Sequence, residues 1–575
     1  MIRLWRFLQP YQTWVALVVV LTFAQTMSTL YLPTLMANIV DTGVIPGNVP
    51  YIIRVGLLML LITVLGGVAA ALSSLCGARA TARFGQNLRS QLFAHVEHFT
   101  LREVDQFGTS SLIVRTTNDV MQVQQLVTMM LGMMVTAPLL AIGGVILAVR
   151  TDARLALTLV VAIPLLGLVM YAVLHRGLGL FRTIQTKVDR LNRVLRENLT
   201  GTRVIRAFHR TAFEVGRFDG ANLDLTDTSV RVFQLMAVLM PAVMLVMNLG
   251  TVAMVWFGGL QINTLHLQIG QLMACIQYVM QVMFGVMMVS MMIFMLPRGE
   301  ASAQRINEVL AVAPEIRDPA EPRPAGAERG RVEFRHVTFA YPGAEQPALA
   351  DISFQAQAGE VTAIIGGTGA GKSTLLNLIP RFYDVAGGSV LIDGVDVREM
   401  SQQELRAKLG YVPQRAVLFT GSVLDNIRYG DLEASAEAVR HAAEVAQATE
   451  FVEGMPERFD AVLTQGGANL SGGQKQRLSI ARALVRRAEI YLFDDSFSAL
   501  DYRTEAQLRA ALRDDAADAT VLIVAQRVSS VVDADRIVVL DDGRVAGIGT
   551  HRDLLSSCPV YREIVSSQLS PEEVA

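Results

Sequence analysis

The sequence predicts two domains of different fold class: an all-α transmembrane domain of six helices at residues 1–312 and an α/β domain at residues 331–575. Three observations support this. The first 300 residues contain long runs without a charged residue. The segment from Ala313 to Gly330 holds four prolines among charged and small residues, which is typical of a linker. After this linker, short β-branched runs alternate with helical patterns, as in α/β domains.

Charge-free runs long enough to cross a bilayer occur five times, and a spanning helix needs roughly 20 apolar residues. The runs are Phe7–Val40, Val55–Ala78, Val120–Val149, Leu155–Leu174 and Val232–Pro297. The last run is too long for one span and contains a polar turn at residues 261–266, so it predicts two spans and brings the total to six. Buried core helices are the alternative, which five such runs in one chain disfavour. The first run is too long for the core of a signal peptide and is interpreted as an uncleaved span.

The distribution of Lys and Arg predicts the orientation. Residues 79–119 and 175–231 are rich in Arg and are expected in the cytoplasm, while the loops near 41–51 and 261–268 carry no Lys or Arg and are expected outside. The loop with Arg150 and Arg154 is also expected outside, against the rule. The composition suggests a bacterial plasma (inner) membrane. No sustained basic patch indicates nucleic-acid binding.

Residues 366–373 of the second domain form a phosphate-loop motif, which predicts a P-loop NTPase fold. It follows the apolar run Val361–Ile365 and precedes a predicted helix. Backbone N–H groups of such a loop point at phosphate oxygens, Lys372 reaches the β- and γ-phosphates, and Ser373 can hold Mg²⁺. The candidate ATP-binding residues here are Gly366, Gly367, Thr368, Gly369, Ala370, Gly371, Lys372, Ser373 and Thr374.

The segment from Leu470 to Gln474 is identical to the signature of ATP-binding cassette (ABC) proteins. With six predicted spans, the chain resembles an exporter-type half-transporter over nearly its whole length. The resemblance implies that two cassettes sandwich two ATP molecules, so that a second half-transporter is required. It also implies further site residues. Tyr341 stacks on adenine, Gln414 and Asp494 help to hold Mg²⁺, Asp501 links the two sites, and Ser471, Gly472, Gly473 and Gln474 face the ATP of the opposing cassette. The alternative interpretation of Tyr341 is a half-buried tyrosine of a strand with no role in nucleotide binding.

Two candidate catalytic residues depart from the family pattern. The family places Glu after the strand-end Asp and His at the switch position, whereas this chain has Asp495 and Gln526. A carboxylate withdrawn by one methylene is expected to orient the attacking water poorly. The departures predict a degenerate ATP site and a heterodimer with a competent partner. The alternatives are a tolerated change with slow turnover, and a homodimer.

The family's coupling elements resemble Thr117–Asp119 and Glu197–Gly201, with short helices near Glu103–Phe107 and Thr211–Phe218. A methionine stripe in the sixth span predicts either an adaptable cavity wall for a hydrophobic small molecule or ordinary packing. It comprises Met280, Met283, Met287, Met291 and Met295, with Gln271, Gln277 and Gln281 as further candidates. The leading hypothesis is ATP-driven export of hydrophobic or amphipathic compounds. An importer on the same scaffold and an ATP-gated regulatory or channel-like protein are the alternatives.

Overall fold

The computed structural model describes residues 6–263, 267–326 and 328–568. The chain divides into two compact units. The first comprises Met1–Glu97 and Thr109–Val312, and the second comprises His98–Gly108 and Ala313–Ala575. The segment 98–108, which the sequence places inside the membrane domain, therefore folds with the second unit.

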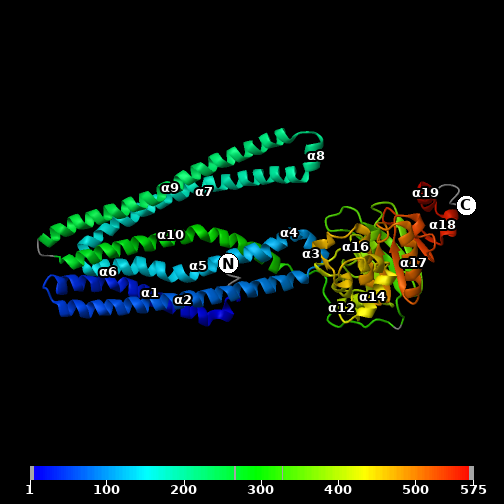
Figure 1. The fold of residues 1–575 in the computed structure, drawn as a ribbon, viewed down its shortest axis with the longest axis horizontal. Coiled ribbons are helices and arrows are strands. Elements are labelled where there is room, and N and C mark those ends of the chain that lie inside the picture. The colour runs from blue at the N-terminus through cyan, green and yellow to red at the C-terminus, as the bar shows by residue number, and fades with distance from the viewer. Residues whose placement is uncertain (1–5, 264–266, 327, 569–575) are drawn as a thin grey trace. The chain divides into compact units, whose positions relative to one another are not determined.

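The first unit is helical (Figure 1). Its α-helices are α1 (Gln12–Asn38), α2 (Val49–Glu97), α4 (Thr109–Val114), α5 (Val120–Pro138), α6 (Gly144–Thr151), α7 (Ala153–Thr200), α8 (Thr202–Ala207), α9 (Thr211–Asn263) and α10 (Ile269–Ala311). The 3₁₀ turn η2 (Gln9–Tyr11) precedes α1, and π-helical turns η3 (Ile39–Val44), η4 (Arg115–Asp119) and η5 (Leu139–Gly143) continue the neighbouring helices.

Six helices in the described residues are long and apolar enough to cross a membrane, which confirms the predicted number. They are Gln9–Val44, Val49–Glu97, Thr109–Thr151, Ala153–Gly177, Thr211–Asn263 and Ile269–Ala311. The predicted turn at residues 261–266 falls partly outside the described residues. Residues 211–218, expected as a separate short helix, instead form the first turns of α9, and the short helix of this segment is α8.

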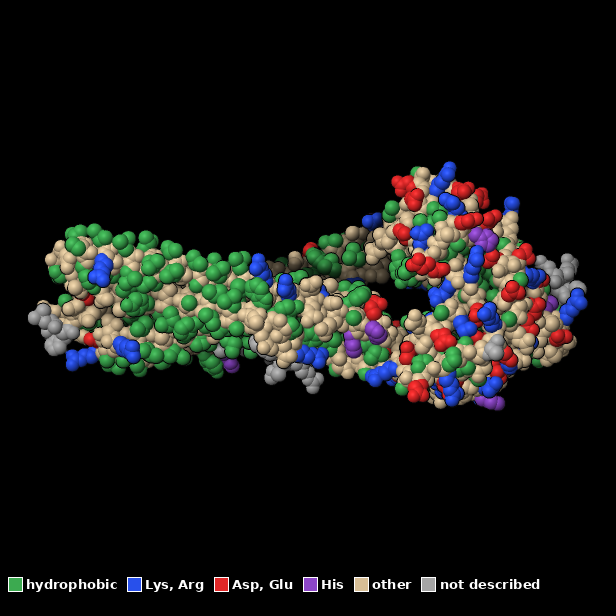
Figure 2. Space-filling model, turned by 90° about the horizontal axis from the view of Figure 1, so that it is seen from below, with side chains coloured by type: hydrophobic (Ala, Val, Ile, Leu, Met, Phe, Trp, Pro, Cys, Tyr) green, Lys and Arg blue, Asp and Glu red, His purple; other side chains and the backbone are tan. Residues whose placement is uncertain are grey.

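Apolar side chains cover most of the visible surface of the helical unit (Figure 2). Leu157, Val161 and Trp256 are each more than 60% exposed. Such exposure suits a bilayer, which solvates apolar groups where water does not. Inside the unit, α7 packs along α9, and the buried ring of Tyr278 joins α10 to α1 through a 2.5 Å hydrogen bond between its hydroxyl and that of Thr34.

The second unit contains two main sheets. An antiparallel sheet has the order β2-β1-β4-β5, and a six-stranded sheet has the order β12-β11-β3-β10-β9-β6. Strands β11, β3, β10, β9 and β6 are parallel and β12 is antiparallel. The strands are β1 (Val332–Phe339), β2 (Leu349–Ala356), β3 (Val361–Gly366), β4 (Gly387–Ile392), β5 (Val395–Asp396), β6 (Leu409–Val412), β7 (Gly421–Ser422), β8 (Val462–Leu463), β9 (Ile490–Asp494), β10 (Thr520–Val524), β11 (Arg536–Asp541) and β12 (Arg544–Gly549).

Helices cover the six-stranded sheet because its central strands are apolar on both faces. Along β3, Ala363 and Ile365 pack into one core cluster with α14, α16 and α17, whereas Ile364 packs into a second cluster with α11 and the antiparallel sheet. The helices are α3 (Leu101–Phe107), α11 (Lys372–Leu378), α12 (Gln402–Ala407), α13 (Val423–Arg428), α14 (Ala436–Val445), α15 (Thr449–Glu453), α16 (Gly472–Leu484), α17 (Tyr502–Asp515), α18 (His551–Ser557) and α19 (Pro559–Gln568).

The short helix α3 is held to residues that follow the first unit. Arg102 forms an ion pair with Glu315, and the carboxylate of Glu103 accepts a hydrogen bond from the Glu315 backbone N–H at 3.2 Å. Glu103 also closes a capping box with Thr100 at the helix N-terminus. The expected short helix near residues 103–107 is thus present, as part of the second unit.

Candidate nucleotide site

The phosphate loop lies between the end of β3 and the first turn of α11. Gly371 caps α11 with a φ of 92°, in the left-handed region that disfavours side chains. A Cβ atom at Gly371 would lie 2.8 Å from the carbonyl oxygen of Ala348, and one at Gly366 would lie 2.2 Å from that of Leu540. Both glycines are therefore required by the backbone. Thr368 is exposed in the loop, whereas Ala370 is buried.

Lys372 folds over the loop that precedes it. Its ammonium group donates to the carbonyl oxygens of Gly366 and Gly367, at 2.9 and 2.7 Å. Burial lowers the pKa of Lys372, and the negative charges of Asp495 and Asp494 oppose that shift. The loop thus places a buried cation beside two carboxylates and a helix N-terminus, an arrangement that suits polyphosphate.

Two of the three candidate magnesium ligands are in contact, while the third, Gln414, donates to Asp495. The hydroxyl of Ser373 donates to Oδ1 of Asp494 at 2.8 Å. Burial raises the pKa of Asp494, an effect that the hydrogen bond from Ser373 reduces and the charge of Asp495 increases. The described residues contain no cluster of three or more His, Cys, Asp or Glu side chains that could hold a metal by themselves. Hydroxyl, carboxylate and amide oxygens fit Mg²⁺, which takes few protein ligands and completes its shell with phosphate and water.

Asp495 follows β9 with a φ of 46°, and its backbone N–H donates to the carbonyl oxygen of Val524 at 2.9 Å. Its Oδ2 atom accepts two amide donors, Nε2 of Gln526 at 2.8 Å and Nε2 of Gln414 at 3.3 Å. Burial raises the pKa of Asp495, and the bonds from Gln414 and Ser498 oppose this. Two candidate residues from different segments therefore converge on one carboxylate oxygen of a third.

Tyr341 lies in an aromatic cluster that the sequence did not indicate in full. Its ring meets Phe339 and Tyr383 edge-on, at centroid distances of 5.0 and 5.5 Å, and its hydroxyl lies 3.0 Å from that of Thr374. Tyr341 is 38% exposed, which leaves ring surface for a base. The pKa of Tyr383 is raised by burial and then by Tyr341 and Asp105 of α3. No motif marks Tyr383 in the sequence.

The signature residues form a separate cluster. Ser471 caps α16 in a capping box with Gln474, and Gly473 packs against the carbonyl oxygen of Ala499. Asp501 caps α17 by accepting the backbone N–H of Thr504 at 3.0 Å. Among the described residues, no hydrogen bond joins Ser471, Gly472, Gly473, Gln474 or Asp501 to the phosphate loop. Ser471 and Gly472 at the N-terminus of α16 are exposed.

The predicted coupling residues are engaged within the first unit. Asp119, with a side chain 3% exposed, accepts hydrogen bonds from Arg305 at 2.7 and 2.5 Å and from Ser302 at 3.0 Å. Asn198 donates to Glu214 at 2.9 Å, and Glu197 pairs with Arg217. Asp119 is thus bonded to α10, and residues 197–198 at the end of α7 are bonded to α9.

The methionines of the sixth span differ in burial and do not all face one cavity. Met283 packs in the bundle core, whereas Met280 and Met291 are about half exposed. Gln271 accepts the Gln268 backbone N–H as a helix cap, and Gln281 donates to the carbonyl oxygen of Thr29. Of the three glutamines, Gln277 alone is exposed.

Comparison with known proteins agrees with this architecture. Residues 15–287 match the ABC transporter transmembrane region and residues 349–498 match the ABC transporter family model. An uncharacterized ABC transporter ATP-binding protein of Mycobacterium tuberculosis is 43% identical over 98% of this chain and 97% of its own length. The ATP-dependent lipid A-core flippase of Chromobacterium violaceum is 33% identical over 93% of this chain and 91% of its own length.

Among solved structures, a bacterial Atm1-family ABC exporter with ATP bound superposes with a TM-score of 0.80, at 27% identity, covering 98% of this chain and 99% of that one. Six spans, a nucleotide domain and these relatives together identify a multi-pass membrane protein. The chain belongs to the ABC transporter family, as a half-transporter of exporter-type fold that carries one transmembrane region and one ATP-binding domain.

Proposed function

We propose that this chain is one half of an ATP-driven exporter of hydrophobic or amphipathic compounds in a bacterial plasma membrane. The similarity to a flippase and to an exporter supports the direction and the class of substrate. The apolar surface and the absence of a charged residue from the central parts of the spans support a lipophilic substrate.

In this proposal the phosphate loop and Lys372 hold the triphosphate and Tyr341 packs on adenine. Ser373, Asp494 and Gln414 supply oxygen ligands for Mg²⁺, whose charge would offset that of the two buried carboxylates. Ser471 to Gln474 at the α16 N-terminus face the nucleotide of a partner cassette. Nucleotide binding at the dimer seam then favours one orientation of the membrane helices over the other, and the substrate moves if its affinity differs between them.

The geometry at Asp495 carries the further proposal that this chain's own site hydrolyses ATP slowly. A general base must reach the attacking water at hydrogen-bond distance. Here the carboxylate is one methylene shorter than the family's Glu, and Gln526 and Gln414 both donate to the same oxygen. Gln526 also lacks the imidazole of the family's His. A site of this kind binds ATP and turns it over poorly, so we propose a heterodimer whose partner has Glu and His at the matching positions.

The test is the rate of phosphate release from Mg²⁺-ATP in lipid nanodiscs. The chain is measured alone and together with a half-transporter that has Glu and His, which is sought first in the neighbouring reading frame. We expect slow turnover alone and an increase of at least tenfold in the pair, with Lys372→Ala in this chain as the background. Brisk turnover by the chain alone would overturn the degenerate site. Failure of either preparation to bind ATP would overturn the transporter proposal itself.

A further inference from the structure

The end of the helical unit where α6 joins α7 carries two basic residues that the positive-inside rule disfavours. Arg150 lies in the last turn of α6 and Arg154 in the first turn of α7. The acidic residue between them, Asp152, is engaged because its carboxylate accepts the backbone N–H of Leu155 at 2.7 Å. Within the described part of the chain, neither arginine side chain forms a hydrogen bond or an ion pair with another residue. The two arginines and Asp152 give residues 150–154 a net positive charge.

Arg154 differs from Arg150 because it lines a groove. The groove lies between α7 and α9 and has a volume of about 610 Å³. Apolar side chains line most of it, and Arg154 and Gln261 lie together at one end, since the two helices are antiparallel neighbours. The apolar lining includes Leu157, Val161 and Leu165 from α7 and Val246, Leu249 and Phe257 from α9. The groove is thus amphipathic, with a cation at its polar end.

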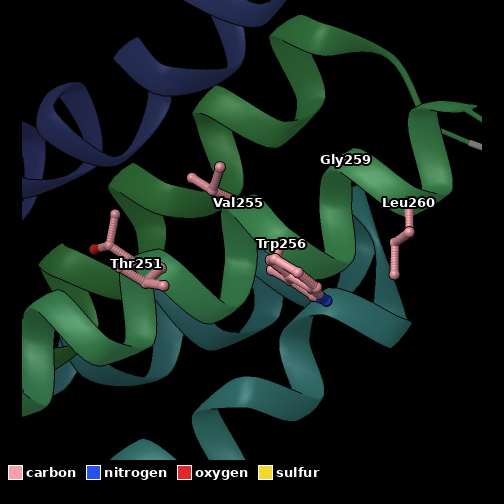
Figure 3. A pocket seen from close by; sticks show the side chains of 6 residues that line it. Thr251, Val255, Trp256, Gly259 and Leu260 are labelled. Atoms are coloured by element: carbon pink, nitrogen blue, oxygen red, sulfur yellow. The ribbon is translucent and has the colours of Figure 1, made fainter.

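The length of the groove matches one leaflet of a bilayer. From Arg154 to Leu165, α7 rises about 16 Å, which is roughly half of a hydrocarbon core of about 30 Å. On α9, Trp256 is 69% exposed, and its indole projects from the helix (Figure 3). Exposed Trp marks the membrane–water interface, and Gln261 lies about 7.5 Å further along the helix. These positions suit an arrangement in which the guanidinium of Arg154 meets lipid headgroups and the apolar lining meets acyl chains.

We propose that this groove binds an anionic phospholipid of the leaflet opposite the nucleotide domain, with the lipid phosphate on Arg154 and an acyl chain along α7 and α9. Arginine binds phosphate with two parallel hydrogen bonds, which neutral residues in the groove cannot replace. The neighbouring hollow on α9, lined by Thr251, Trp256 and Gly259 among others, has no charged residue and serves as an internal comparison. The site is separate from the ATP site, which residues of the second unit form.

Photo-crosslinking in nanodiscs tests the proposal. Phosphatidylglycerol and phosphatidylcholine with the same photoactivatable acyl chain are compared at equal concentration, and the labelled peptides are identified by mass spectrometry. In the wild-type protein we expect phosphatidylglycerol to label residues 154–165 and 246–261 about tenfold more than phosphatidylcholine, a difference of about 1.4 kcal/mol. Both lipids carry a phosphate, but the choline ammonium repels the guanidinium of Arg154 and offsets the charge of that phosphate. Arg154→Gln should bring the ratio close to one and Arg154→Lys should keep part of it. Arg150→Gln, the same charge change outside the groove, should leave it unchanged.

A second pair of variants tests the apolar part. A Cβ atom at Gly250 or at Gly259 would meet nothing within 4 Å, so both positions accept a larger side chain. Gly250→Phe should block the groove and reduce labelling by both lipids, whereas Gly259→Phe, which fills the neighbouring hollow, should not. The proposal is overturned by equal labelling from the two lipids in the wild-type protein, by an equal effect of Arg150→Gln and Arg154→Gln, or by crosslinks from the groove to a second polypeptide in place of lipid. Thermal unfolding midpoints within a few degrees of wild type confirm that each variant is folded.

Discussion

Lengthening the carboxylate at position 495 should restore hydrolysis at this chain's own ATP site. In the structure, Oδ2 of Asp495 accepts Gln526 at 2.8 Å and Gln414 at 3.3 Å. Asp495→Glu moves the carboxylate outward by about 1.5 Å, one carbon–carbon bond. Gln526→His removes one of the two amide donors and supplies the imidazole that the family uses. The double variant should therefore bring a carboxylate with one amide donor fewer closer to the attacking water.

The size of the effect follows from the displacement. An error of about 1 Å in the position of a catalytic group costs roughly a hundredfold in rate, and a general base contributes about 10² to 10⁴. We expect the double variant to turn over ATP about a hundredfold faster than wild type, a difference of about 2.7 kcal/mol in activation free energy. Asp495→Glu alone should give a smaller increase because Gln526 still donates to the carboxylate.

Phosphate release from saturating Mg²⁺-ATP in nanodiscs is the assay, and the same variants with Lys372→Ala provide the background. Asp514→Glu adds the same methylene on the exposed face of α17 and should have no effect. A wild-type turnover within about twofold of that of the double variant would refute the reasoning, because the gain expected of a general base is far larger. The shorter carboxylate would then not slow hydrolysis.

Three further predictions concern binding and stability. Gly371→Ala should abolish binding of a fluorescent ATP analogue, because φ is 92° and the new Cβ would lie 2.8 Å from a carbonyl oxygen, while Gly367→Ala, which meets nothing within 4 Å, should retain it. Arg305→Met should destabilise the membrane domain by about 2–3 kcal/mol, because it leaves the buried Asp119 carboxylate without its cation. The loss is measured as a lower midpoint of thermal unfolding. Adding Asp119→Asn to this variant should recover part of the lost stability. Burial raises the pKa of Asp494 above its ordinary value of 3.8. The stability that protonated Asp494 gives the nucleotide-free domain is therefore present below that ordinary value and is lost as pH rises through the raised pKa. The Mg²⁺-dependent part of ATP affinity, measured by titration from pH 7.5 to 5, should weaken as pH falls toward the raised pKa, and Asp494→Asn should leave only the pH dependence that comes from protonation of the nucleotide phosphates.

The sequence predicted the six spans because a bilayer excludes charge, so the charge-free runs are visible without a structure. It underestimated the helices that contain them. Helix α9 runs from Thr211 to Asn263. It therefore begins about twenty residues before the charge-free run, which starts at Val232. Charged residues are compatible with a helix outside the hydrocarbon region, and the sequence pattern there does not distinguish a continuing helix from a loop.

Within the nucleotide domain, the phosphate loop and the strand-end acid were predictable because each is a local motif beside an apolar strand. The relations between motifs were not. Nothing in the sequence indicates that Tyr341 contacts Thr374, or that Gln414 and Gln526 donate to the same oxygen of Asp495. The contacts of Gln414 and Gln526 depend on the parallel order β10-β9-β6, which brings the ends of strands distant in sequence to one edge. Tyr341 instead follows β1 of the antiparallel sheet.

The attachment of α3 to the second unit has a consequence for biosynthesis. Residues 98–108 leave the ribosome about two hundred residues before Glu315, which pairs with Arg102 and whose backbone N–H donates to the carboxylate of Glu103. This helix therefore cannot find its native contacts while the membrane helices are being inserted, and must wait, solvated, until the cassette emerges. A cassette expressed from residue 313 onward would lack α3 and expose the surface that receives it, so the isolated fragment is an incomplete folding unit.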